Sequence, residues 1–403
     1  MNQLAALGLI LLLALLAGHV VKFLRIPEVT GYLLAGVLLG PAGGNLITHE
    51  GLESLQVFSE VALGLILFAI GSVFEFARFR RIGRRVAGLT AVESLLAAFF
   101  VAGGLLAIGQ PLIVALLLGV IAMETAAAST LMVMRECNAE GPLTDTLGGV
   151  IALNNIFCLT GFLVVAAGFD LYQESTRTGL GWVVLYRSLY PLIWQLIGSV
   201  ALGFMIGVLL AAWSSRVREH GEMLILLVGA ILLAVGAAQL LELSPLLATL
   251  AVGATMVNLS TESRRLFDTL AQTDPPLYAI FFVIAGADLN LWLLPSLGII
   301  GAVYILGRLG GKLFGTMLVT RRMAAAPVVR RYLGFAMLSQ AGLAVGLLLA
   351  INRRYPDLAP VITTVVLAAV TVFELVGPLS ARQALIRAGE AHPQGQEPAP
   401  LNL

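Results

Sequence analysis

The stretch PLIVALLLGVIAMETAAASTLMVM, residues Pro111–Met134, is long and apolar enough to cross a lipid bilayer, yet a polar segment lies near its middle. That segment is METAAAST, Met123–Thr130, and its one ionisable side chain is Glu124. A charged side chain at the bilayer centre costs roughly 2.5–3.5 kcal/mol on insertion scales, so such residues are functional candidates. We therefore interpret this stretch as a transmembrane helix interrupted beside Glu124 and Thr125.

The whole chain has the composition of a membrane protein. Of its 403 residues, 59% are hydrophobic and 12% are charged, and the mean hydropathy is +0.96. A soluble domain with this composition would expose large apolar patches, so the sequence predicts an all-α polytopic membrane protein. The formal net charge of +1 argues against a nucleic-acid-binding protein. No phosphate-binding glycine loop or metal-binding pattern is present, and we expect neither enzyme activity nor a cofactor.

Thirteen apolar stretches are candidate transmembrane helices, since about 20 residues cross the hydrocarbon core. They are Leu4–Val20, Val29–Ile47, Leu55–Phe74, Val86–Ile108, Pro111–Met134, Thr146–Phe169, Leu189–Trp213, Met223–Leu241, Pro245–Val257, Leu277–Leu289, Leu291–Leu318, Tyr332–Ile351 and Leu358–Leu379.

The basic residues support this count, because Lys and Arg concentrate in cytoplasmic loops. Of the 24 Lys and Arg residues, 18 follow odd-numbered stretches and 4 follow even-numbered ones, while Arg308 and Lys312 lie within the eleventh. The alternation predicts a multi-pass protein of the cell inner membrane with its N-terminus outside and its C-terminus in the cytoplasm. Residues 1–389 form the predicted membrane domain, and the polar, proline-rich residues 390–403 are predicted to be a disordered cytoplasmic tail.

Thirteen helices divide into six, one linker and six, so the second six run inverted relative to the first. Inverted repeats are the common plan of secondary transporters, with sites where interrupted helices meet. The fifth helix of each six carries a polar interruption: Met123–Thr130 in the first and SQAG, Ser339–Gly342, in the second. We therefore expect two discontinuous helices at corresponding places.

Polar side chains on four of the predicted helices lie at similar depths. Converting residue positions to distance along a helix brings them near one level of the bilayer. They are Glu124 and Thr125, Asn154 and Asn155, Arg308 and Lys312, and Ser339 and Gln340. We expect these residues to surround an ion site, with Glu93 on the fourth helix as a further charge near it.

Several motifs resemble one known family. They occur in the family's order and spacing over nearly the whole chain: IPEVTGYLLAGVLLGP at Ile26, GLILFAIGSVFE at Gly64, FFVIAGADLNL at Phe281, GRLGGK at Gly307, LSQAGLAVGL at Leu338 and GPLSARQALIRAGE at Gly377. The chain thus resembles the cation:proton antiporter-2 family of the monovalent cation:proton antiporter superfamily, which includes Kef-type and NapA-type sodium/proton exchangers.

The resemblance implies a NhaA/NapA-like fold and a homodimer. Helices 1–3 and 8–10 would form a dimerisation part, and helices 4–6 and 11–13 a moving core. It also implies exchange of Na+ or K+ for protons by alternating access in an elevator-like motion. The sequence does not select between Na+ and K+, because amide and carbonyl oxygens bind both.

One departure from the family affects the proton site. The sixth helix usually carries a carboxylate pair, or a carboxylate beside a polar residue, but this chain has Asn154 and Asn155. An amide can coordinate a cation through its oxygen but cannot release a proton. Three hypotheses follow: the proton site has moved to Glu124, or the protein carries an anion or neutral solute without proton coupling, or it is a non-transporting regulator.

The buried charges also leave alternatives open. Glu124 either binds the ion or simply pairs with Arg308, since buried ions normally need a partner. Lys312 is expected to extend towards the cytoplasm, with the core charges balanced among Glu93, Arg308 and Lys312. Glu374 and Asp288 lie near the predicted helix ends and are expected to be structural.

Overall fold

The computed structural model describes residues 3–24, 26–178, 186, 190–191, 193–217, 219–289, 298–323 and 325–392. This part of the chain is helical and contains no strand. Its helices are α1 (Gln3–Phe23), α2 (Glu28–Leu39), α3 (His49–Gly71), η1 (Ser72–Phe74), α4 (Phe76–Ala107), α5 (Leu112–Ile121), α6 (Ala127–Glu136), α7 (Pro142–Thr178), η2 (Trp194–Gly198), α9 (Ser199–Ser214), α10 (His220–Leu240), α11 (Pro245–Leu259), α12 (Ser263–Asp288), α13 (Gly298–Arg322), α14 (Pro327–Ala336), α15 (Gly342–Arg354) and α16 (Ala359–Ala388).

Many of these helices are suited to a lipid environment. Eight described helical segments are long and apolar enough to cross a membrane, and they lie in α1, α3, α4, α7, η2 with α9, α10, α13 and α16. Shorter apolar segments lie in α2, α5, α11, α12 and α15. Large apolar side chains such as Leu12, Phe204 and Ile225 are exposed, as expected where lipid is the solvent. The chain is therefore an all-helical, multi-pass membrane protein.

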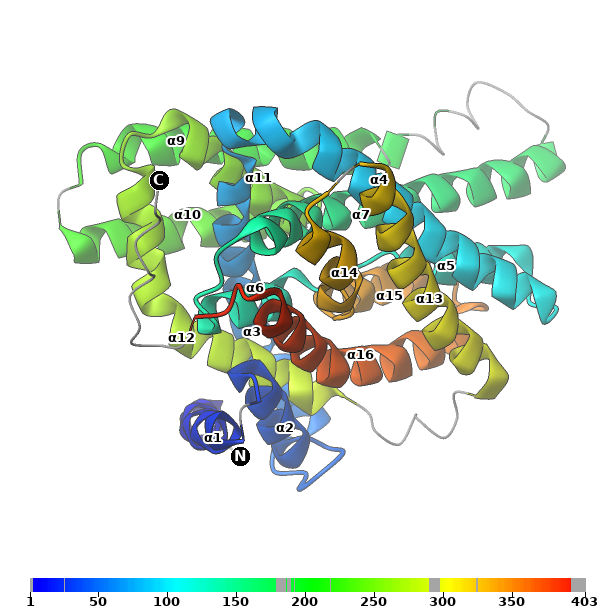
Figure 1. The fold of residues 1–403 in the computed structure, drawn as a ribbon, viewed down its shortest axis with the longest axis horizontal. Helices are drawn as coiled ribbons and strands as arrows, with labels where there is room; N and C mark the ends of the chain where they lie inside the picture. The colour runs from blue at the N-terminus through cyan, green and yellow to red at the C-terminus, as the bar shows by residue number, and fades with distance from the viewer. Residues whose placement is uncertain are drawn as a thin grey trace.

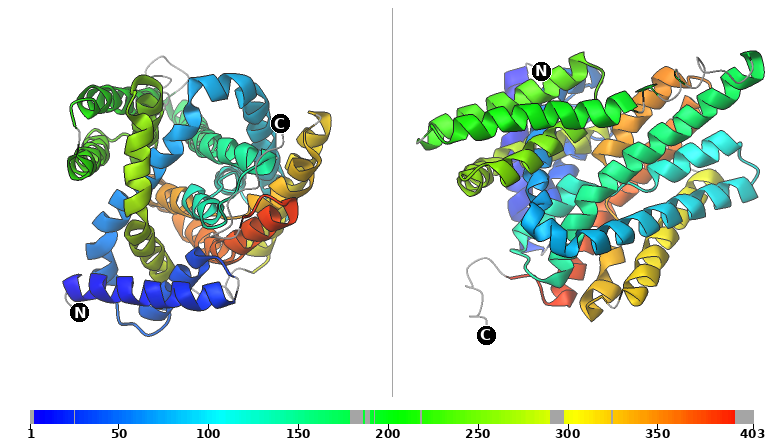
Figure 2. Two further views of the ribbon diagram at one scale, coloured as in Figure 1. Left: turned by 60° about the vertical axis from the view of Figure 1, so that its left-hand side comes forward. Right: turned by 90° about the horizontal axis from the view of Figure 1, so that it is seen from above.

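The helices form two groups (Figure 1). Helices α1 to α3 and α9 to α12 make the first group, in which α2 packs on α12 and α3 on α11. Helices α4 to α7 and α13 to α16 make the second group, in which α13 packs along α4. In the left panel of Figure 2, α9, α10 and α12 lie on one side and α1 runs along the bottom, while the second group fills the right.

Glycine allows two very close helix contacts in the first group. A Cβ on Gly286 of α12 would lie 2.2 Å from the Leu33 carbonyl oxygen of α2. A Cβ on Gly253 of α11 would lie 2.1 Å from the Phe68 carbonyl oxygen of α3. In lipid, apolar side chains gain little by packing against one another. Helices therefore associate through small residues, which let their backbones approach closely. These glycines thus fix the α2–α12 and α3–α11 pairs.

Some helix ends differ from the predicted ones. Helix α2 ends at Leu39, well before Ile47, because Gly40 precedes Pro41 and a residue before proline avoids the helical region. Helix α4 begins at Phe76, so the arginine-rich segment after it is helical. Helix α16 continues to Ala388, which places Glu374 in the middle of the helix. The expectation that Glu374 lies near a helix end is therefore wrong.

The predicted tail also begins too early. Glu390 is 4% exposed, and its carboxylate accepts hydrogen bonds from the backbone N–H groups of Leu143 and Thr144, both at 2.7 Å. It also accepts one from the Thr144 hydroxyl at 2.7 Å. A carboxylate in this position satisfies N–H groups at the start of α7 that have no partner within the helix. Residues 390–392 are thus ordered, and residues 393–403 lie outside the described part of the chain.

Candidate ion-binding site

The second group contains two pairs of short helices, and within each pair a five-residue linker joins one helix to the next. Helix α5 ends at Ile121 and α6 begins at Ala127, while α14 ends at Ala336 and α15 begins at Gly342. We call the intervening residues 122–126 and 337–341 the first and second linkers. The Ala126 N–H of the first linker donates to the Ser339 carbonyl of the second at 3.0 Å, so the linkers contact one another. Polar sequence in otherwise apolar stretches therefore coincides with non-helical backbone.

Glycine also brings α16 against the second linker. A Cβ on Gly377 would lie 2.5 Å from the Ser339 Cα and 2.6 Å from its backbone nitrogen. No side chain fits into this space. The contact places the middle of α16, including Glu374, beside the linkers.

Arg308 of α13 holds the two linkers together. Its side chain is wholly buried, and it donates to the backbone carbonyls of Leu338 at 2.7 Å, Glu124 at 2.6 Å and Ser339 at 3.1 Å. Its guanidinium carbon lies 4.2 Å from the centre of the Phe373 ring, a favourable cation–π position. The carbonyl groups that follow the C-terminal ends of α5 and α14 carry partial negative charge, which Arg308 offsets.

Buried charged side chains often form ion pairs, but the Glu124 carboxylate does not pair with Arg308. Among the described residues, no Lys, Arg or His nitrogen lies within 4.0 Å of the Glu124 carboxylate. That carboxylate is 1% exposed and accepts a hydrogen bond from the Ala341 N–H, with oxygen distances of 3.2 and 3.5 Å. Ala341 directly precedes α15, so Glu124 faces the positive N-terminal end of this helix.

Lys312 is wholly buried and turned into the protein. Its Nζ lies 3.2 Å from the Glu93 Oε1, and it donates to the Met123 carbonyl at 2.5 Å and the Thr125 hydroxyl at 2.7 Å. The expectation that Lys312 extends towards the cytoplasm is therefore wrong. Helices α13 and α4 pack through glycine here: a Cβ on Gly315 would lie 2.9 Å from the Glu93 Cα.

The two asparagines of α7 have different environments. Asn154 is wholly buried, and its Nδ2 lies 2.9 Å from the Glu93 Oε1, the Ser94 hydroxyl and the Met123 carbonyl. Asn155 is half-buried and donates to the Ile151 carbonyl of its own helix at 3.2 Å. The structure thus brings Asn154 into the charged cluster and leaves Asn155 beside it.

Residues that the sequence interpretation did not include complete the surroundings. Gln340 donates to the Ile121 carbonyl at 3.0 Å and to the Tyr304 hydroxyl at 2.8 Å. Tyr304 lies four residues before Arg308, one helical turn along the same face, and this spacing could have identified it. Ser94 adjoins Glu93 in the sequence, and Ser129 belongs to the polar segment Met123–Thr130, with its hydroxyl 3.5 Å from a Glu374 oxygen.

Several buried oxygens near the linkers have no hydrogen-bond donor among the described residues. They are Glu93 Oε2, Asn154 Oδ1, Ser339 Oγ, Gln340 Oε1 and Glu374 Oε2. Buried polar atoms in folded proteins nearly always have a partner, so each of these oxygens needs one. Water, a proton or a cation could supply it.

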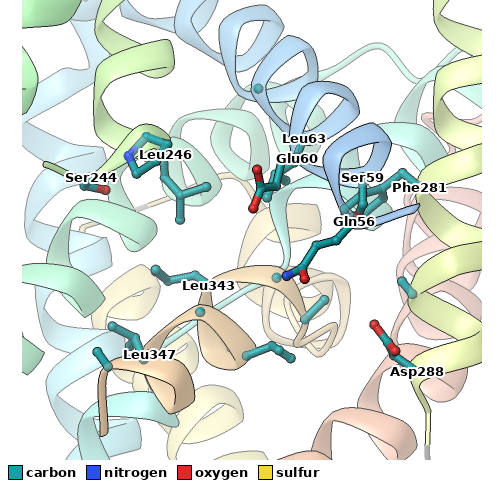
Figure 3. Close-up of a pocket in the computed structure, with 18 of the residues that line it drawn as sticks. Gln56, Ser59, Glu60, Leu63, Ser244, Leu246, Phe281, Asp288, Leu343 and Leu347 are labelled. Carbon is teal, nitrogen blue, oxygen red and sulfur yellow. The ribbon is translucent and has the colours of Figure 1, made fainter. Parts of the chain in front are cut away.

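A cavity of about 710 Å³ leads to the second linker. Its walls come from α3, α10, α11 and α12 of the first group and from α7, α15 and α16 of the second. Figure 3 shows the side chains of Gln56, Glu60 and Asp288 among those that line it. Ala341 and Glu374 line it as well, and the Ala341 N–H binds the Glu124 carboxylate. The cavity therefore connects with the buried charges.

Short helices whose ends and linkers meet beside buried charges in a multi-pass helical protein are the arrangement of a secondary transporter, not of an enzyme. Residues 8–381 match the model of the family described as "Sodium/hydrogen exchanger, transmembrane". The chain therefore belongs to the sodium/hydrogen exchanger family, which confirms the class predicted from the sequence motifs.

Two solved structures show the same fold. Both are of the sodium proton antiporter MjNhaP1 from Methanocaldococcus jannaschii, with 18% sequence identity to this chain. The structure at pH 8 has a TM-score of 0.68 and covers 96% of each chain. The electron microscopy structure has a TM-score of 0.75 and covers 97% of this chain and 99% of that one.

Proposed function

We propose that this protein exchanges a monovalent cation, Na+ or K+, for a proton by alternating access, and that Glu124 binds both in turn. The observation that carries the proposal is the environment of the Glu124 carboxylate. It is buried among the linkers, no cationic side chain of the described residues pairs with it, and one backbone N–H binds it. A carboxylate left in this state needs either a proton or a cation.

The buried charges give the reason for exchange. Glu93, Glu124 and Glu374 are each at most 2% exposed, and so are Arg308 and Lys312. If all are ionised, three carboxylates face two cations. Glu93 pairs with Lys312 and Arg308 binds backbone carbonyls, so the Glu124 charge has no cationic partner whether or not Glu374 holds a proton. A proton or a monovalent cation neutralises that charge, and the two cannot do so together. Competition for one site couples the release of one ion to the binding of the other.

The neighbouring side chains have separate tasks in this mechanism. Arg308 stays bound to linker carbonyls, and Lys312 stays beside Glu93, so both are fixed charges. Asn154 supplies an amide oxygen, and Ser339 and Gln340 supply further oxygens for the cation. Thr125 positions Lys312 through its hydroxyl. Asn155 donates to a carbonyl of its own helix, so we assign it a lesser part in cation binding.

We further infer thirteen transmembrane segments, with α5 and α6 as halves of one discontinuous helix and α14 and α15 as halves of another. Corresponding features in the two halves of the chain support an inverted repeat. The α2–α12 and α3–α11 contacts both pack through glycine, and the two linkers interrupt the fifth segment of each repeat. The first helix group would hold the dimer together, and the second would move.

Location and orientation belong to the same proposal. The distribution of Lys and Arg favours the inner membrane, an external N-terminus and a cytoplasmic C-terminus. In that orientation the cavity opens outwards, because it is lined by the first half of α3 and the last part of α12. Its acidic residues, Glu60 and Asp288, would attract cations from the external solution.

The anion alternative has less support. Arg308 and Lys312, the groups that would attract an anion, are already occupied by carbonyl and carboxylate oxygens. The cavity wall adds carboxylates, and the Arg354 that lines it pairs with Asp170. An anion would therefore meet net negative charge on its way to the linkers.

The test uses purified protein in lipid vesicles with an imposed proton gradient and a pH-sensitive dye inside. Addition of NaCl or KCl to the wild-type protein should collapse the gradient. Glu124→Gln should abolish the response, whereas Glu50→Gln, which changes an exposed carboxylate, should leave it intact. Unchanged exchange by Glu124→Gln would refute the assignment of Glu124, and failure of the wild-type protein with both salts would refute cation:proton exchange.

A further inference from the structure

Glu374 is a buried carboxyl group for which the exchange mechanism provides no task beyond its charge. It lies in the middle of α16 and is 2% exposed. Its Oε1 receives the Ser129 hydroxyl at 3.5 Å, the outer limit of a hydrogen bond, and its Oε2 has no donor among the described residues. No Lys, Arg or His nitrogen of those residues lies within 4.0 Å of it. Such weak contacts do not offset the cost of burying an ionised carboxylate.

Glu374 also faces the cavity and lies beside Ser129, close to the first linker. It lines the cavity together with Ala341, whose N–H binds the Glu124 carboxylate. The charged groups that act on Glu374 are Glu124, which repels it, and Arg308, which attracts it. A second carboxyl group therefore lies where cavity water approaches the charges around Glu124.

We propose that Glu374 is a proton relay between the cavity and Glu124, an inference that rests on the proposed exchange function. In the loading direction, the protonated Glu374 carboxyl group gives its proton to the Glu124 carboxylate, directly or through one water. A hydronium ion in the cavity then gives a proton to the Glu374 carboxylate and leaves water, so Glu374 is again protonated. The reverse sequence releases the proton when a cation binds. One O–H bond forms for each that breaks, and no redox partner is needed.

Substitution of a proton relay changes the rate of proton transfer without changing cation affinity. Substitution of a cation ligand would change cation affinity, and substitution of a purely structural carboxyl group would not selectively slow proton transfer. The substitution Glu374→Gln keeps the size and the hydrogen-bonding capacity of the protonated side chain, but an amide cannot transfer a proton. Loss of the relay should slow proton movement, while the cation site at Glu124, Asn154 and the linker oxygens stays complete. A cation ligand, by contrast, would lose affinity when substituted.

The experiment measures both properties on the full-length protein. Na+-driven proton flux in vesicles is recorded from pH 6 to 9, and Na+ affinity is taken from the Na+-dependent rise in melting temperature in detergent. Glu374→Gln should lower the flux at least ~10-fold, a typical loss when a positioned proton-transfer group is removed, with an unchanged Na+ affinity. Glu374→Asp should keep measurable flux with an altered pH profile, and the exposed-site control Glu50→Gln should match wild type.

Other outcomes overturn the relay. Wild-type flux and pH profile in Glu374→Gln would show that protons reach Glu124 without it. A large loss of Na+ affinity in both Glu374→Gln and Glu374→Asp would make Glu374 a cation ligand instead. The variant Glu124→Gln tests the exchange function separately from the relay. Normal exchange by Glu124→Gln would refute the proposed role of Glu124, whatever the result for the Glu374 variants.

Discussion

Lys312 and Glu93 form an ion pair with a nitrogen–oxygen distance of 3.2 Å, and both side chains are wholly buried. The same Glu93 oxygen accepts a hydrogen bond from Asn154 at 2.9 Å. The carboxylate beside the basic side chain thus comes from α4, and the amide comes from α7. The chain keeps a negative group near Lys312 although α7 has no carboxylate at positions 154 and 155.

This relationship predicts that the carboxylate and the amide can exchange places. Glu93→Gln leaves Lys312 as a buried, uncompensated charge, a change that typically costs about 3–5 kcal/mol. Adding Asn154→Asp returns a carboxylate to the same contact and should recover most of the loss. Thermal unfolding in detergent measures both effects.

Asn155 supplies the matched control for this exchange. Its side chain bonds to its own helix and does not contact the Lys312–Glu93 pair among the described interactions. The double variant Glu93→Gln with Asn155→Asp should therefore stay as unstable as Glu93→Gln alone. Equal recovery by both double variants would show that the position of the charge does not matter.

Arg308 is predicted to be irreplaceable by Lys. Its guanidinium reaches carbonyls of both linkers and stacks on Phe373, whereas an ammonium group is a compact point charge that cannot present a planar fork. Hydrogen bonds to charged groups contribute about 1.5–3 kcal/mol each, so Arg308→Lys should lower the unfolding free energy by roughly that amount or more. The exposed Arg387→Lys should have little effect in the same unfolding assay. Equal melting temperatures for the two variants would contradict the linker-clamping role.

The α2–α12 contact is predicted to tolerate no side chain. Gly286→Ala places a methyl group 2.2 Å from the Leu33 carbonyl oxygen, so the helices must separate. Overpacking of this kind costs typically about 1–3 kcal/mol. Gly229→Ala is the control, because a Cβ there has no neighbour within 4 Å among the described residues. Melting temperatures of the two variants should differ clearly, and similar values would show that the close approach is not needed.

The Glu390 cap predicts a local role for the end of the chain. Glu390→Ala removes the acceptor of the Leu143 and Thr144 N–H groups, and loss of a helix cap costs about 0.5–2 kcal/mol. Truncation after His392 keeps the cap and should leave the melting temperature unchanged. If the truncation destabilised the protein as much as Glu390→Ala, the cap would not explain the effect.

Much of the fold could be predicted because lipid imposes simple rules. A helix that crosses the bilayer needs an apolar stretch of known length, and cytoplasmic loops carry Lys and Arg. Helix ends were harder to predict. Helix α4 continues over the arginine-rich segment from Phe76, and α16 continues to Ala388, because polar helical turns can extend into the aqueous phase without an apolar signal.

The candidate site could be predicted in its membership but not in its pairing. Glu124, Asn154, Arg308 and Lys312 stand out because polar groups are costly in lipid. The contacts among these residues depend on the rotation of each helix and on the path of the linkers. Neither property produces a recognisable local pattern in the sequence. Arg308 binds a Glu124 backbone carbonyl and not its side chain, a contact that only the three-dimensional arrangement reveals.

The central claim is that one buried negative charge takes either a proton or a cation. The direct measurement is proton release from purified protein in weakly buffered detergent solution when NaCl or KCl is added. The account predicts release of one proton for each cation bound, and none from Glu124→Gln. Cation binding without proton release in the wild-type protein, or equal release from Glu124→Gln, would contradict it.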